Sequence, residues 1–120
     1  MENLKDFFGI VVYSIENDED GYLLNGLWTN NKANNKIMNE IARKQHGKNQ
    51  DIQGNYKLAW IEPDEKFPVC GTLKIEKTNQ EETTYSFEWW EKGNNKKPNF
   101  IGKGLRIGEK QLVAFYWIAE

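Results

Sequence analysis

The residues most able to do covalent or acid–base chemistry are few and scattered along the chain. His46 is the only histidine, Cys70 the only cysteine, and Ser14 and Ser86 the only serines. Nucleophilic catalysis needs a base beside the nucleophile and a third group that orients the base, and the spacing of these four residues indicates no such arrangement. We therefore interpret His46 as a solvent-exposed residue and Cys70 as a structural one, and we predict no catalytic residue.

Two short segments resemble ligand-binding loops but lack residues that such loops need. ENDEDG at 16–21 is acidic at alternate positions with glycine sixth, as in a calcium loop, but its twelfth position is Leu27, where a bidentate glutamate is required. GKGLRIG at 102–108 lacks the spacing of a phosphate-binding loop and leads into a strand, not a helix. We interpret 16–21 as a hairpin turn and predict neither a metal ion nor another cofactor.

The charge balance gives little support to nucleic acid as a partner. The formal net charge is −2, whereas nucleic-acid-binding domains are usually strongly basic. Basic residues gather modestly in 32–48 and 92–110, where a solvated surface explains them. No apolar window has the length of a membrane helix, and the short apolar run near the amino terminus has acidic neighbours. We expect a first strand there, no membrane contact and a cytoplasmic protein.

Aromatic residues carry most of the structural signal. The chain has five tryptophans, five tyrosines and six phenylalanines. Along YSFEWWEK, neighbouring side chains of a strand point to opposite faces, so Tyr85, Phe87 and Trp89 share one face and Trp90 lies on the other. The alternation predicts that Trp89 is in the core and Trp90 on the outside.

Other segments show the same strand pattern. VCGTLKIEK alternates apolar and polar residues, and YKLAWIE places Tyr56, Leu58 and Trp60 on one face. Polar turns separate successive strands into hairpins. The last strand, QLVAFYWIA, is apolar on both faces, so we expect another element to cover its outer face.

One segment departs from this pattern. Ile37, Met38, Ile41 and Ala42 recur at helical spacing, which predicts a short α-helix near 34–45 that ends by Gly47. Together these patterns predict a single domain over 1–120, mainly β, with about six to eight antiparallel strands. The strands form either an up-and-down barrel or a strongly curled meander of hairpins, with the helix inserted after Trp28.

The carboxy-terminal hairpins resemble those of a known kind of protein. The pattern comprises Trp89, Gly102, Gly104, Leu105, Gly108, Leu112, Val113, Ala114 and Tyr116. Over 83–118 the chain is similar to small bacterial barrels of the lipocalin-like and avidin-like kind, with a fainter echo in 54–77. The resemblance implies an up-and-down barrel and a binding protein. It carries over no ligand, because the disulfides of secreted lipocalins and the polar residues that avidins place around biotin are missing.

Three hypotheses of function follow. In the first, the chain is a non-enzymatic protein that binds a small apolar or aromatic ligand in the barrel mouth. The residues expected to line this mouth are Trp28, Tyr56, Trp60, Tyr85 and Trp89.

In the second hypothesis, the chain is a cytosolic interaction module: an inhibitor, an immunity-type protein or a homodimer. It would bind its protein partner through an outer face around Trp90, Trp117 and Arg106. An enzyme of unassigned reaction is the third hypothesis.

Overall fold

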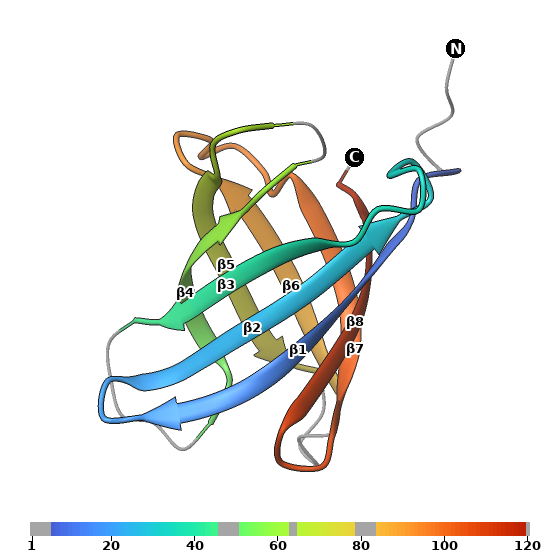
Figure 1. Ribbon diagram of the computed structural model, residues 1–120. Coiled ribbons are helices and arrows are strands. Elements are labelled where there is room, and N and C mark those ends of the chain that lie inside the picture. The colour runs from blue at the N-terminus through green and yellow to red at the C-terminus, as the bar shows by residue number, and fades with distance from the viewer. Residues whose placement is uncertain (1–5, 46–50, 63–64, 79–83, 120) are drawn as a thin grey trace.

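The computed structural model describes residues 6–45, 51–62, 65–78 and 84–119, and these form a barrel of eight strands (Figure 1). The strands are β1 (Gly9–Asp18), β2 (Gly21–Asn30), β3 (Met38–Lys44), β4 (Gly54–Trp60), β5 (Val69–Lys77), β6 (Thr84–Glu91), β7 (Phe100–Ile107) and β8 (Gln111–Ile118).

The barrel is closed and each strand pairs with its neighbours in chain order, always antiparallel. β1 closes it by pairing with both β2 and β8, so that Tyr13 stands opposite Gly26 on one side and Leu112 on the other. Closure removes the unpaired edges of an open sheet. The predicted up-and-down antiparallel barrel is confirmed, and it is the architecture that the resemblance implies.

Alternating burial along the strands separates the core from the outside. In β1 every second residue from Gly9 to Ile15 is buried and the residues between them are exposed. β6 follows the same rule, with Trp89 in the core and Trp90 half-buried on the outer face, as predicted.

The predicted helix near 34–45 is wrong. Asn34 and Asn35 adopt positive φ in a turn, and 38–44 form strand β3 between β2 and β4. A spacing of four residues is close to one helical turn, but it is also an even number. Met38 and Ala42 therefore lie together inside the barrel, while Ile41 lies outside with 47% of its surface exposed. Gly47 lies outside the described residues.

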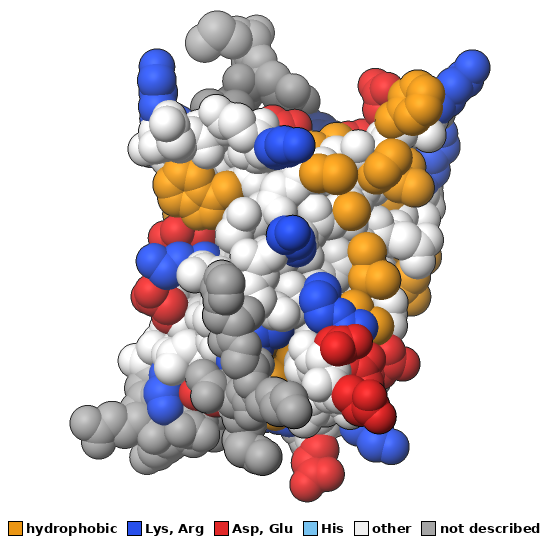
Figure 2. Space-filling view, turned by 90° about the vertical axis from the view of Figure 1, so that its left-hand side faces the viewer, with side chains coloured by type: hydrophobic (Ala, Val, Ile, Leu, Met, Phe, Trp, Pro, Cys, Tyr) orange, Lys and Arg blue, Asp and Glu red, His pale blue; other side chains and the backbone are white. Residues whose placement is uncertain are grey.

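The predicted cover over the outer face of β8 is also wrong. Phe115, at the middle of that face, exposes 55% of its surface and packs beside Trp117, with ring centroids 5.4 Å apart. Residues 38–44, which the sequence predicted to lie on a helix, are a strand of the barrel wall and do not cover β8. Other apolar side chains lie on the outside too, and Figure 2 shows several gathered toward the right, over the strands nearest the viewer in Figure 1.

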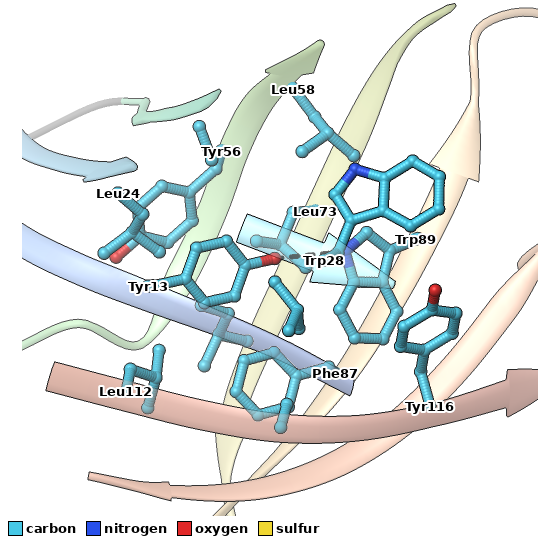
Figure 3. Packing of buried hydrophobic residues seen from close by; sticks show 14 of the residues in the cluster. Tyr13, Leu24, Trp28, Tyr56, Leu58, Leu73, Phe87, Trp89, Leu112 and Tyr116 are labelled. Carbon is cyan, nitrogen blue, oxygen red and sulfur yellow. Dashed lines mark hydrogen bonds between the residues drawn. The ribbon is translucent and has the colours of Figure 1, made fainter. Parts of the chain in front are cut away.

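The two ends of the barrel interior differ. Tyr56 and Tyr85 lie near the starts of β4 and β6, which are at the lower end of the barrel in Figure 1. Both are fully buried, and the Tyr56 hydroxyl donates to the carbonyl of Ile52 at 2.6 Å. In Figure 3, Tyr56 and Leu24 lie at one end of the core cluster, and Trp89 and Tyr116 lie at the other. The first end is filled by side chains, whereas the second borders a cavity.

Gly26 leaves space for the Tyr13 ring inside the barrel. It stands between Tyr13 on β1 and Glu40 on β3, and all three positions point inward. A Cβ at Gly26 would lie 2.8 Å from the Tyr13 ring, closer than real Cβ contacts come. The missing side chain thus lets the tyrosine ring lie across β2 and bring its hydroxyl to the Glu40 carboxylate.

Gly26→Val should lower the free energy of unfolding by about 1–3 kcal/mol, the usual cost of overpacking a core, although valine favours strands. Urea unfolding measures the change. Asn25→Ala, at the exposed neighbouring position, is the control and should stay within about 0.5 kcal/mol of the parent. Equal stability of Gly26→Val and the parent would mean that Tyr13 does not need this space.

Candidate functional site

A cavity of about 480 Å³ opens at the upper end of the barrel in Figure 1. The ends of β2, β4, β6 and β8 meet the starts of β3 and β7 there, together with the segment that precedes β1. Its aromatic lining consists of Phe7, Trp28, Trp60, Trp89, Phe100 and Tyr116. The volume lies in the range of small-ligand sites.

The aromatic rings on one side of the cavity hold each other in place. The Tyr116 centroid lies 5.6 Å from that of Trp89, 5.7 Å from that of Phe100 and 6.1 Å from that of Phe7. Trp89 also stacks on Phe87, at 5.6 Å and 13°. The Tyr116 hydroxyl donates to the carbonyl of Thr29 and accepts from the Asn30 amide. Ring contacts and hydrogen bonds therefore order this wall of the cavity.

Glu40 supplies a carboxylate among these rings. Its side chain lines the cavity, although only 7% of the residue surface is exposed. Oε2 accepts hydrogen bonds from the Tyr13 hydroxyl and from Nε1 of Trp89, the latter at 3.3 Å. Figure 3 shows the Tyr13 hydroxyl pointing toward the Trp89 indole. Nε1 of Trp89 donates to this hydroxyl oxygen as well, at 3.2 Å. Among the described residues, Oε1 accepts no hydrogen bond.

Burial controls the protonation of this group. Removal from water raises the pKa of Glu40 to about 7, although the hydrogen bonds from Tyr13 and Trp89 favour the carboxylate and lower it. Burial, reinforced by the nearby Glu40 charge, raises the pKa of Tyr13 well above its ordinary value. Burial also raises the pKa of Tyr116, to about 12. Both tyrosines are therefore neutral where Glu40 titrates.

The structure separates the five residues predicted to line the mouth. Trp28, Trp60 and Trp89 come together around the cavity. Tyr56 and Tyr85 lie in the packed lower half, away from it. The three tryptophans occupy equivalent places near the upper ends of β2, β4 and β6, and each is nearly fully buried.

The three residues predicted for the outer interface do not form one surface. Trp117 lies beside Phe115 on β8, whereas Trp90 on β6 borders a shallow depression with Thr72 and donates its Nε1 hydrogen to Glu88. Arg106 stands opposite Leu112, which is fully buried, so its position on β7 faces inward. The Arg106 charge acts on Tyr56 in the packed end.

The acidic turn and the single cysteine do not line the cavity. ENDEDG forms the tight β1–β2 turn, where Asp18 pairs with Arg43 at 2.8 Å. Cys70 is exposed on the outer face, and His46 lies outside the described residues. In the described part of the chain, no group of three or more His, Cys, Asp or Glu residues is placed to hold a metal ion.

Sequence reasoning missed Glu40, Tyr13 and Tyr116 as site residues. Glu40 was hidden by the predicted helix, on which a glutamate would simply be solvated. On a strand, it lies on the same inward face as Met38 and Ala42, and both of these are buried. The signal was therefore present: a charged residue at an inward position, with a glycine opposite to admit a tyrosine.

No profile of a known protein family, no curated protein and no solved structure matches this chain. Within the described residues, no helix has the length and apolar character needed to span a bilayer. The site must therefore be interpreted from its own geometry.

The raised pKa of Glu40 predicts an unusual dependence of stability on pH. Between about pH 4.5 and 7 the unfolded chain releases the Glu40 proton while the folded protein keeps it, so the free energy of unfolding falls as pH rises. At about 1.4 kcal/mol per pH unit, the fall is roughly 3 kcal/mol and levels off above pH 7.

Urea unfolding of the wild type and Glu40→Gln at several pH values isolates this effect, because other carboxyl groups titrate equally in both proteins. The amide oxygen of glutamine still accepts from Tyr13 and Trp89. A stability difference between the two proteins that is constant from pH 4.5 to 7 would contradict the raised pKa.

Proposed function

We propose that this barrel is a cytoplasmic, non-enzymatic binding protein of the lipocalin-like kind, with a small aromatic or apolar ligand in its mouth. The observation that carries the proposal is the cavity of about 480 Å³ between Trp28, Trp60, Trp89 and Tyr116. Small-ligand sites are typically concave and apolar, with a few polar groups at fixed places. The cytoplasmic location is supported by the single thiol, Cys70, which is exposed and unpaired.

The indole N–H groups favour a ligand bound through ring faces. Trp28 donates to the carbonyl of Asn39 at 3.2 Å, and Trp60 donates to Glu62 at 2.8 Å. Trp89 donates to Glu40 and Tyr13. With these donors engaged by the protein, the tryptophans offer apolar surface to a ligand. Flat or compact apolar groups gain most from such contacts.

The neutral fluorophore N-phenyl-1-naphthylamine is a suitable probe. Its fluorescence should rise on binding, and Trp60→Leu should weaken binding about tenfold or more, a loss of about 1.4 kcal/mol. The matched control is Trp90→Leu, which changes a tryptophan on the outer face and should leave the affinity unchanged.

Circular dichroism establishes whether each variant is folded. If Trp60→Leu is unfolded, Ile118→Trp replaces it, because this half-buried position lines the cavity and a larger side chain there should block entry. Unchanged probe affinity in a folded Trp60→Leu or Ile118→Trp protein, or an equal loss in Trp90→Leu, would refute binding in the mouth.

A second candidate function is self-association through the outer face of β7, β8, β1 and β2. Leu105, Val113, Val12 and Leu27 stand opposite one another in a single row across these strands. With Ile10, Phe115 and Trp117 they form what we call the outer apolar surface. Trp117 belongs to it, and Trp90 lies beyond it on β6.

The favoured occupant of this surface is a second copy of the chain. Lys103, which stands opposite Phe115, places one charge among these residues. The surface is therefore poorer in charge than the chain as a whole, in which 28% of the residues are charged. A partner must therefore be similarly apolar and poor in charge, and the same face of another copy meets this need in a two-fold dimer.

Phe115→Glu should shift a dimer to monomer, because it would bury a carboxylate in the interface. Sedimentation velocity at micromolar concentration measures this. Thr72→Glu is the control, since it adds the same charge at an exposed position on β5. A wild type that is monomeric throughout would refute self-association through this surface.

A further inference from the structure

We propose that the ligand of the mouth is a cation: an amine or quaternary ammonium group carried on a small apolar or aromatic body. The inference rests on the proposed function and names its ligand class. Its basis is a buried carboxylate in the lining of an aromatic cavity, one oxygen of which accepts no hydrogen bond from the described residues, together with further carboxylates in that lining.

The hydrogen-bonding capacity of the cavity is unbalanced. The three indole N–H groups and the Asn30 amide donate to protein oxygens. Oε1 of Glu40, by contrast, accepts no hydrogen bond within the described part of the chain. When Glu40 is ionised, the described lining thus presents an acceptor to the cavity, and a ligand that supplies a donor or a positive charge completes it.

The charges of the lining point the same way. Glu40, Glu62 and Glu65 contribute carboxylates, and Glu62 and Glu65 lie at the rim. Lys32 is the basic residue among the described lining residues, and it is already engaged with another group. An anionic ligand would meet this excess of negative charge in a site of low polarity, which is costly. A cation would be attracted both to the rim and to the base.

The aromatic rings are also suited to a cation. The face of an indole or phenol ring is negative, and cations bind within about 6 Å of the ring centre. Trp28, Trp60, Trp89 and Tyr116 surround the same space, and the N–H groups of the tryptophans point to other partners. An ammonium group seated near Oε1 of Glu40 would therefore have a counter-charge below and ring faces around it.

A cation also accounts for the cost of the buried carboxylate. Glu40 titrates near pH 7 because its charge is poorly solvated. A cation beside Oε1 stabilises the ionised form, so binding and ionisation of Glu40 are coupled. Binding should then release a proton from Glu40 at pH values below 7.

The decisive experiment compares two ligands of the same shape. Phenyltrimethylammonium carries a permanent positive charge, and tert-butylbenzene replaces its nitrogen by carbon. At pH 8, where Glu40 is ionised, calorimetric titration should show at least tenfold tighter binding of the cation. Glu40→Gln should remove this preference, weakening the cation at least tenfold and the neutral ligand by less than about twofold. Glu76→Gln, on the outer face of β5, is the control and should change neither.

A second measurement uses pH. Between pH 8 and pH 6 the affinity for phenyltrimethylammonium should fall several-fold in the wild type and stay level in Glu40→Gln. Comparing the wild type with Glu40→Gln isolates the effect of Glu40, because the other ionisable groups near the ligand are the same in both proteins. These groups are Tyr13 and Tyr116 beside Glu40, and Glu62, Glu65 and Lys32 elsewhere in the lining. The wild-type comparison of the two ligands decides the question even if the variant does not fold.

The outcomes separate the two proposals. Binding of tert-butylbenzene as tightly as the cation, or more tightly, would overturn the cation inference and leave ligand binding in the mouth intact. Failure of both ligands, together with N-phenyl-1-naphthylamine, would overturn ligand binding as well. A cation preference that survives Glu40→Gln would also overturn the inference, because it would place the attraction elsewhere.

Discussion

The buried carboxylate of Glu40 is the constraint around which the upper half of the barrel is organised. A charge removed from water is costly unless hydrogen bonds compensate it, and here the Tyr13 hydroxyl and the Trp89 indole both donate to Oε2. These donors come from β1 and β6, on different sides of the barrel. Holding them together fixes the positions of two large rings, and through the Trp89 ring the contacts extend to Phe87 and Tyr116.

The same arrangement explains why the interior is filled at one end and hollow at the other. A barrel of eight strands has an interior about wide enough for its own side chains to fill. Around Tyr13, apolar residues such as Leu24, Leu73 and Leu112 pack with no exposed surface. Above it, the rings of Trp28, Trp60 and Trp89 stand around the mouth, and each indole N–H is drawn to a protein oxygen.

The fold could be predicted because most strands place apolar residues at every second position, as in the segment containing Trp89 and Trp90. The error at β3 has a physical origin: Met38 and Ala42 are spaced alike for a helical stripe and for one face of a strand. That error then hid Glu40. Grouping Trp28, Trp60 and Trp89 was within reach, because they occupy equivalent hairpin positions. Separating Tyr56 and Tyr85 from them requires the register of each strand, since one tilted strand reaches both ends of the barrel.

Stability alone does not account for a glutamate at position 40. An apolar residue of similar size would pack among these rings without the desolvation cost, and replacing buried charges by apolar groups is often neutral or stabilising. Within the described residues two donors reach Oε2, and none reaches Oε1 on the side that lines the cavity. The carboxylate oxygen on the cavity side therefore supports the proposed cationic ligand, which the other carboxylates and the ring faces of the lining also favour.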